Sequence, residues 1–459
     1  MINEVIHDPI FLSQKSETAS KDKNRNTSYI FIPFCFEKKD NFREIIKCID
    51  HSGSWKLKHD NIKYMFKFVA DKFDSKNPER CLCFHYTLEN TDFVCSDIFL
   101  QNEWICTERH IIENKEQQYK FKINNVHMHC FSTSVGIMAF NVSYESSEPM
   151  YVSTAQYFLK KVSREKLFCE KIGKFFTFME LAHILTDEIN RNFSMNFFYY
   201  SNSGTQRANM LTYIESDYKE DFSDELFYLR KCYASDFPIS KSAESEKQEI
   251  HKALESVQWG FSNEAAVCIT CPEKGREGFV KNTFFSNFNE QYLFMYVFLL
   301  HQKYVLYLFL TQIGEDLIDG VDKLENYRKR LNEFETDFVF SRITEVPQYQ
   351  ELYDKILTAF ALKEMYTDVN EPLRTLDEIQ RQKSEEIQNK NEKSLTRTLA
   401  VLSLLSVFSA LVDSFDFISE LGSLMTWHSI AINIVQFVLI ALILTILVYV
   451  VKKVVNPRK

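Results

Sequence analysis

The strongest hydrophobic pattern lies at the C-terminal end of the chain. Residues 429–451 are uncharged, and Asn433 and Gln436 are their only strongly polar members. As a helix this segment is about 34 Å long, enough to cross a hydrocarbon core of about 30 Å. Residues 398–412 form a shorter uncharged run of about 22 Å, at whose start the Arg397 side chain can reach back toward the interface. We expect both segments to span a membrane; the alternative for the shorter one is a buried amphipathic helix.

Charges around the two segments predict their orientation. The tail at 452–459 contains four Lys and Arg residues, whereas residues 413–428 contain Asp413, Asp416 and Glu420 and no Lys or Arg. Basic residues mark cytoplasmic flanks, so we expect a cytoplasmic C-terminus and an outer acidic loop. Two spans return the N-terminal part to the cytoplasm, and no signal peptide is visible. The predicted location is the inner (plasma) membrane, with two spans and both termini cytoplasmic.

Short β-branched and aromatic runs dominate the first third of the chain after a polar start. Such runs, separated by polar turns, predict strands. The alternation of apolar and polar residues is clearest from Tyr119 to Ile123. The runs are 29–36, 64–70, 80–88, 119–126 and 136–144.

Helical patterns mix with strands farther along. Amphipathic helices are predicted over 154–168 and 177–193. Residues 289–313 are strongly apolar, but His301, Gln302 and Lys303 divide them into runs too short to cross a membrane. We therefore expect this segment to be a helix buried in the cytoplasmic domain.

A charged helical region follows Gly314. Two helices are predicted over 316–340 and 348–365, broken around Pro347. Asn370 is a predicted helix cap, with Pro372 in the first turn. No Gly or Pro follows before Val412. One helix of about 43 residues, about 65 Å long, is therefore expected to enter the membrane.

Polar residues on this long helix gather on one side. At about 100° per residue they fall within roughly 80°, provided that the helix continues past Val412. A ring of identical helices around water requires such a stripe, and Asp413 then places one carboxylate per subunit at the outer mouth. The alternative is that the small hydroxyl residues mediate close helix packing. The predicted pore-lining residues are Asn391, Thr398, Leu402, Ser406, Ser409 and Asp413, and the outer acidic loop holds Asp413, Asp416 and Glu420.

Composition narrows the function classes. The chain has 459 residues, with 41 Phe and 22 Tyr against 10 Gly and 9 Pro, and a formal net charge of −9. No basic excess is present to neutralise phosphates, so no direct nucleic-acid binding is expected. The 11 cysteines, an odd number, indicate reduced thiols in a cytosolic domain.

Metal binding and catalysis have weak sequence support. The candidate ligand groups are Cys81 with Cys83, Cys268 with Cys271, and the cluster His127, His129 and Cys130. A zinc site needs a second well-spaced ligand pair, which is missing, so buried structural thiols are favoured and no metal site is assigned. His127 and His129 share one face of a strand. Because no base or third ligand is identifiable, we expect the chain not to be an enzyme.

The order of these segments resembles the CorA family of magnesium and divalent-cation transporters. The resemblance covers about the last 140 residues: a stalk helix, a first span, a short outer loop, a second span and a basic tail. Residues 129–144 (HCFSTSVGIMAFNVSY) also look like strand text of divergent CorA-like domains, and residues 290–309 like the helix before their stalk. The resemblance implies an α/β cytoplasmic domain and a homopentamer with the first span around a central pore. Mg²⁺ or another divalent cation is then the transported ion.

One family motif is missing. CorA proteins carry Gly-Met-Asn at the end of the first span, where this chain has SALVDSFDFISELGSLMTW. Since Mg²⁺ holds its water tightly and needs polar groups to receive it, the chain is not expected to be a standard Mg²⁺ importer. CorA-like proteins without the motif include membrane effectors of type III CRISPR antiviral systems, which respond to a SAM–AMP conjugate. The resemblance therefore implies a nucleotide second messenger as gating ligand, with no ligand-binding residues assigned.

The main hypothesis is thus a CorA-like homopentameric cation channel or transporter, gated by its cytoplasmic domain. Its partners are other copies of itself, the lipid bilayer, cations and a small nucleotide. The alternative is a non-conducting, membrane-anchored sensor or scaffold. The predicted parts are a ragged N-terminus (1–28), an α/β regulatory domain (29–315), a helical stalk (316–397), a first span (398–412), an outer loop (413–428), a second span (429–451) and a basic tail (452–459).

Overall fold

The chain divides into two units, Met1–Val369 and Asn370–Lys459, and each is described by itself. A computed structural model describes the backbone of residues 25–37, 41–88, 103–110, 115–198, 206–238, 250–274, 277–319 and 321–422. It also describes six helical residues farther along, Ile434, Phe437, Val438, Ala441, Thr445 and Tyr449.

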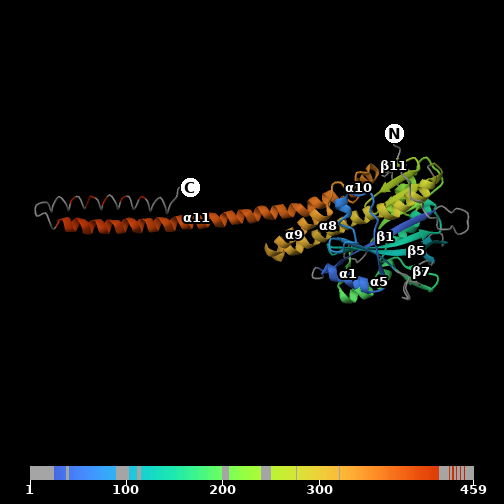
Figure 1. Cartoon of the computed structure of the whole chain (residues 1–459), viewed down its shortest axis with the longest axis horizontal. Coiled ribbons are helices and arrows are strands. Elements are labelled where there is room, and N and C mark those ends of the chain that lie inside the picture. Colours follow the sequence, from blue (N-terminus) through green and yellow to red (C-terminus); the bar gives the residue numbers. More distant parts are fainter. Residues whose placement is uncertain are drawn as a thin grey trace, which may run out of the picture. The chain divides into compact units, whose positions relative to one another are not determined.

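The first unit is an α/β domain built on one sheet (Figure 1). Thirteen strands of the described residues belong to it, in the order β11-β12-β13-β10-β1-β6-β5-β4-β7-β8, while β9 pairs with β1, β3 with β5, and β2 with β3. Only the β10–β13 pairing is parallel among these described pairs. The strands are β1 (Asn26–Phe36), β2 (Trp55–Lys58), β3 (Cys83–Leu88), β4 (Glu103–His110), β5 (Lys115–Phe131), β6 (Val135–Tyr144), β7 (Leu167–Cys169), β8 (Lys174–Phe176), β9 (Met195–Phe197), β10 (Asn209–Glu215), β11 (Ile250–Leu254), β12 (Val257–Phe261) and β13 (Ala265–Thr270).

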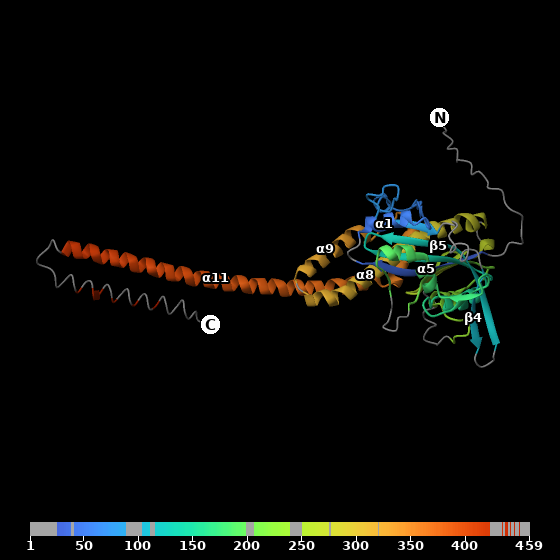
Figure 2. The same cartoon turned by 90° about the horizontal axis from the view of Figure 1, so that it is seen from below.

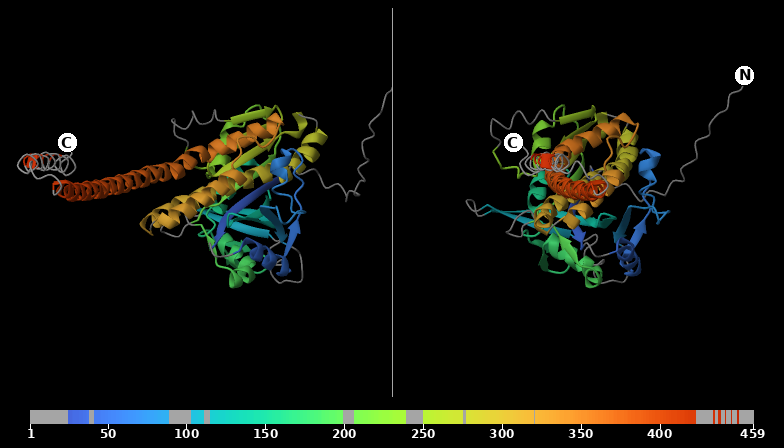
Figure 3. Two further views of the ribbon diagram at one scale, coloured as in Figure 1. Left: turned by 60° about the vertical axis from the view of Figure 1, so that its left-hand side comes forward. Right: turned by 90° about the vertical axis from the view of Figure 1, so that its left-hand side faces the viewer.

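Helices cover both faces of this sheet. In Figures 1 and 3, α1 and α5 lie on one side and α8 on the other. The α-helices whose bounds the structure describes are α1 (Phe42–His51), α2 (Lys67–Ala70), α4 (Pro149–Leu159), α5 (Phe178–Asn192), α6 (Ser223–Lys231), α7 (Phe285–Asn287), α8 (Leu293–Asp319), α9 (Val321–Phe338), α10 (Pro347–Ala359) and α11 (Leu362–Gly422). The shorter turns are η2 (Pro272–Lys274), η3 (Phe279–Phe284) and η4 (Phe288–Tyr292).

Strand β1 shows why the sheet needs both layers. Its side chains are buried almost without a break, which is typical of a strand covered on two faces. Ile30 and Phe34 join the core that α1, α4 and α5 close. Phe31 points the other way, with its ring 5.1 Å from that of Tyr296 in α8. The apolar run that predicts this strand is therefore explained by burial on both sides.

A bulge in β5 decides which side chains face α8. The pairing of β5 with β6 shifts register between Ile123 and Asn125, and an extra residue of this kind reverses the alternation of side chains. Val126 consequently points into the core beneath α1 and α5. Phe131 faces α8 instead, where its ring stacks on His301 at 3.8 Å. In Figure 2, β4 and the adjoining half of β5 project from the rest of the sheet.

Most predicted elements of the first unit are confirmed. Strands occupy four of the five predicted runs, and the alternation from Tyr119 to Ile123 appears as buried apolar and more exposed lysine side chains. The helix predicted over 177–193 is α5, which Thr177 caps. The strand predicted over 64–70 is wrong, because this segment forms bends and the short helix α2. The helix predicted over 154–168 begins earlier, at Pro149 behind the capping Glu148, and ends at Leu159.

The apolar segment near residue 300 is a core helix. Among the described residues, one helix is long and apolar enough to cross a membrane, Phe279–Gln312, and 78% of its apolar stretch is buried. His301 is fully buried and accepts or donates a 2.7 Å hydrogen bond with the Thr133 hydroxyl. Burial within the α/β unit matches the expectation for residues 289–313.

Helix boundaries after Gly314 differ from the predicted ones. Helix α8 runs to Asp319, α9 ends at Phe338, and α10 begins at Pro347 itself. The predicted cap at Asn370 is wrong: α11 begins at Leu362, after Ala361 makes the turn in the left-handed conformation (φ 53°). Pro372 lies inside α11 and removes one backbone hydrogen bond, which the helix on either side outweighs.

Helix α11 also continues farther than predicted. It extends to Gly422 and so includes the first ten residues of the predicted outer loop 413–428. The condition for a stripe continuing past Val412 is therefore met at the level of the backbone. The rest of that loop lies outside the described residues, as do residues 1–24, the tail 452–459 and most of the segment 429–451. The N-terminus predicted to be ragged over 1–28 is wrong at its end, because residues 26–28 belong to β1.

Candidate functional site

Three histidines gather on the α8 side of the sheet. His85 of β3 lies directly opposite His129 of β5 in the antiparallel ladder. His127 lies two residues before His129, and therefore on the same face of β5. Asp60 follows β2, the strand that pairs with the other edge of β3. The strand register thus brings residues 60, 85, 127 and 129 together.

The side chains form a continuous polar cluster. His85 Nδ1 lies 2.7 Å from Asp60 Oδ1, and His85 Nε2 lies 3.0 Å from His127 Nδ1. The rings of His85 and His129 stack with centroids 4.0 Å apart. His129 Nε2 is buried and makes no hydrogen bond with the described residues. A buried polar nitrogen in this state is unfavourable unless a ligand or water satisfies it.

Burial also sets the protonation of the cluster. Desolvation lowers the pKa of His85, His127 and His129 well below the usual value, so the rings are neutral at pH 7. Desolvation raises the pKa of Asp60, with nearby His129 and Lys58 acting in the opposite direction. Neutral imidazoles offer lone pairs, and the Asp60 side chain remains 27% exposed. The cluster is therefore inside the domain but reaches solvent at its carboxylate.

The other predicted ligand groups do not come together in this way. In the part of the chain that the structure describes, Asp60, His85 and His129 are the set of at least three potential ligands whose atoms lie within 4.8 Å of one another. Cys130 points into the opposite core, so the sequence cluster with His127 and His129 is divided by the strand. The spacing of His127 and His129 in the sequence indicated that they share a face. No sequence feature indicated His85 or Asp60, because they reach the cluster through the pairing of β3 with β5 and β2.

The thiols behave as buried core groups. The described cysteines form no disulfides, and most are buried. Burial raises the pKa of Cys83 and Cys268 well above the usual value. Burial likewise raises the pKa of Cys81, to about 11, although its thiol donates a hydrogen bond to the carbonyl of Cys83. These thiols are protonated at pH 7, which matches the sequence interpretation of structural cysteines.

The predicted pore-lining residues all lie on α11. Within the single chain their side chains are exposed. Thr398 and Ser406 each donate a 3.0 Å hydrogen bond to a carbonyl of the preceding turn, Ser394 and Leu402 respectively. Asp413 is exposed. Asp416 and Glu420 lie on the same helix, but their side chains are outside the described set, and the assignment of all these residues to a pore stays a prediction.

The surrounding part of α11 exposes large apolar side chains. Between residues 395 and 412 the exposed fractions of such side chains range from 46% to 65%. An apolar strip of this size is unfavourable in water and marks a surface that contacts lipid or protein. The residues are Leu395, Leu399, Val401, Leu402, Leu405, Val407, Phe408 and Val412.

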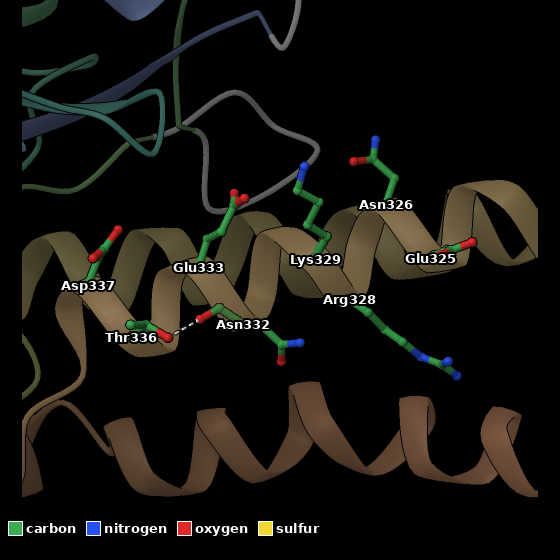
Figure 4. Close-up of a pocket in the computed structure, with 8 residues that line it drawn as sticks. All are labelled: Glu325, Asn326, Arg328, Lys329, Asn332, Glu333, Thr336 and Asp337. Atoms are coloured by element: carbon green, nitrogen blue, oxygen red, sulfur yellow. Dashed lines mark hydrogen bonds between the residues drawn. The ribbon is translucent and has the colours of Figure 1, made fainter.

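A shallow hollow of about 900 Å³ lies along α9 (Figure 4). The described residues that line it all belong to α9, and both charge signs alternate along them, with Lys329 one turn from Glu325 and from Glu333. Thr336 donates a 2.8 Å hydrogen bond to the carbonyl of Asn332, so its hydroxyl serves the helix itself. This mixed-charge surface does not select one ligand class.

Comparisons with models of protein families, with curated proteins and with solved structures found no match to this chain.

Proposed function

We propose that the protein is a CorA-like membrane cation channel or transporter, a homopentamer gated by its α/β unit. The observation that carries the proposal is the change of character along α11. Up to residue 394 the exposed surface is charged, and from Leu395 to Val412 it becomes largely apolar without a break in the helix. Exposing such an apolar surface to water is unfavourable, whereas contact with lipid tails removes this unfavourable free energy.

The second support is the distribution of polar residues on that helix. At about 100° per residue, Thr398, Ser409 and Asp413 fall on one side. The apolar residues Val407 and Phe408 fall roughly 120° to 140° from the middle of that side. Five copies with this side inward would surround water, and lipid would contact the apolar side. In this arrangement residues 429–451 form the second span, and the membrane is the inner (plasma) membrane.

The α/β unit takes the regulatory role in this proposal. A resemblance to CorA-like effectors suggests a SAM–AMP conjugate as gating ligand and antiviral defence as the setting. The test combines assembly with conduction. Native mass measurement of the detergent-solubilised protein should give five copies, and proteoliposomes should conduct cations when the conjugate is added.

Asp413 provides the sharpest variant for this test. Asp413→Asn removes one carboxylate per subunit and should lower the preference for cations over anions, whereas Asp413→Glu should retain it. A monomer or dimer that is stable in several mild detergents would contradict the proposal. Flux and selectivity that are unchanged by Asp413→Asn would contradict the acidic ring.

A non-conducting, membrane-anchored sensor is the second candidate, and one observation favours it. The hydroxyls of Thr398 and Ser406 are satisfied by their own helix, so they do not require water. In this case, replacing Ser406 and Ser409 together with Leu would leave function intact. The channel proposal expects the same double substitution to abolish flux while the protein remains in the membrane.

A further inference from the structure

The histidine cluster of the α/β unit has the chemistry of a transition-metal site. Two imidazoles and one carboxylate are a ligand set that Zn²⁺ takes in proteins, commonly with water as the fourth ligand. His85 and His129 are held by the β3–β5 ladder, while Asp60 comes from the segment after β2. We propose that Asp60, His85 and His129 bind one Zn²⁺ ion.

The hydrogen bonds indicate which nitrogen of each ring would bind. His85 Nε2 is directed toward His127, so His85 Nδ1, on the Asp60 side, is the nitrogen left for the ion. His129 contributes Nε2, its buried nitrogen that has no partner among the described groups. His127 then acts on the ion through His85, accepting at Nδ1 the proton of His85 Nε2–H. Such outer partners fix the tautomer and the orientation of a metal-binding histidine.

The distances fit a site that closes on its ion. Ligand atoms around Zn²⁺, at bond lengths near 2.1 Å, lie about 3.4 Å apart in a tetrahedral arrangement. Here the atoms of the three groups lie within 4.8 Å of one another, and the Asp60–His85 pair is at 2.7 Å. Metal–nitrogen bonds lie in the ring plane, so the stacked rings of His85 and His129 must turn toward each other on binding. The loop position of Asp60 allows its carboxylate to move with them.

Charge and access favour the same conclusion. His85 and His129 are buried, and an ion would satisfy the His129 Nε2 that makes no hydrogen bond with the described residues. The partly exposed Asp60 supplies both the negative charge and the route from solvent. The nitrogen-rich set favours Zn²⁺ over Mg²⁺, which prefers oxygen ligands. The site is therefore separate from the transport of cations proposed for α11.

The experiment uses the full-length protein in detergent, purified with a tag that contains no histidine and stripped with a chelator. Zn²⁺ is then titrated against a chromophoric competitor, and bound metal is counted by mass spectrometry. We expect one Zn²⁺ per chain, no competition by millimolar Mg²⁺, and a rise in the melting temperature of the α/β unit.

Asp60→Asn is the decisive variant, because the amide oxygen can still accept a hydrogen bond from His85. It should weaken Zn²⁺ binding by more than about 100-fold. Loss of a residue that only hydrogen-bonds to a metal ligand already lowers metal affinity by about 10- to 100-fold, and loss of a ligand should lower it further. His127→Gln should weaken binding by about tenfold. His183→Gln changes an exposed histidine of α5 and should have no effect. If Asp60→Asn binds Zn²⁺ as the parent does, or the parent binds none, the proposal is wrong, whatever the flux assays give.

Discussion

Phenylalanine side chains meet opposite environments in the two units of the chain. Phe31 and Phe140, in neighbouring strands of the sheet, are fully buried, whereas Phe408 of α11 is 59% exposed. Most large apolar side chains of the first unit are buried by other parts of the same unit. In the described part of the second unit, large apolar side chains of α11 are exposed instead, which favours contact with lipid or protein. Four predictions test this difference, from the largest expected effect to the smallest.

Charging the apolar side of α11 should have the largest effect. Two arginines, Val407→Arg with Phe408→Arg, cost about 2.5–3.5 kcal/mol each at the centre of a span. The first span should then fail to insert. A cysteine placed at Ser414 would report this by losing its labelling with an impermeant maleimide applied to spheroplasts.

The matched control for the arginine pair is Val407→Leu with Phe408→Leu, which should leave the labelling at position 414 unchanged. Labelling that survives the arginine pair would contradict a spanning role for residues 398–412.

Adding a side chain at Gly136 of β6, which packs closely against Phe34 of β1, should destabilise the first unit. A Cβ on Gly136 would lie 2.2 Å from Cζ of Phe34, so the ring or the strand must shift. Gly136→Ala should lower the free energy of unfolding by about 1–3 kcal/mol, measured by urea denaturation of the α/β unit in the full chain. Adding Phe34→Leu should recover part of the loss by making room.

Gly278→Ala is the control for Gly136, because no atom lies within 4 Å of the added Cβ and its backbone is helical. An equal loss in both variants would show that steric contact with Phe34 is not the cause.

Cysteine labelling should separate the two sides of α11 itself. Ser409→Cys lies on the polar side and should react with a water-soluble thiol reagent in proteoliposomes, because only hydrated thiols form the reactive thiolate. Phe408→Cys, one residue away, should face lipid and react much more slowly. Equal rates would favour simple helix packing over a water-filled pore.

The smallest expected effect concerns a single helix cap. Thr177 accepts a hydrogen bond from the N–H of Glu180, whose carboxylate in turn accepts one from the N–H of Thr177. Thr177→Ala should reduce the stability of the first unit by about 1 kcal/mol. Thr358→Ala, at an exposed position inside α10, should remain within about 0.5 kcal/mol of the parent. Reversal of this order would exclude the cap as a source of stability.

Local patterns predicted the elements of the first unit better than its site. Apolar runs identified β1, β5 and β6 because burial on a sheet leaves a direct trace in the sequence. The aromatic run 64–70 led to a wrong strand prediction, because burial of apolar side chains leaves the same trace in a segment that is not a strand. Its aromatic residues pack against distant side chains, as Phe68 does against Phe340, and only tertiary structure shows that no strand is needed there.

The candidate site depends on pairing that a single sequence does not reveal. The spacing of His127 and His129 placed them on one face, but their partner His85 is 42 residues away from His127 and meets it through strand register. Cys130 was grouped with them by proximity in sequence, although alternation sends it to the other face of the sheet. The continuity of α11 was predictable, because no Gly or Pro interrupts residues 373–412, but its start at Leu362 and its end at Gly422 were not.

The position of β1 at the centre of the sheet has a consequence for synthesis of the protein. Its partner β10 follows by about 184 residues, as in the Ser28–Thr212 contact. At about 5–20 residues per second, β1 waits roughly 10–40 s for that neighbour. Thr270, the last residue of β13, is made well before residue 398. All strands of the sheet can therefore pair before residue 398 leaves the ribosome, so folding of the first unit need not wait for the helix α11 to be completed.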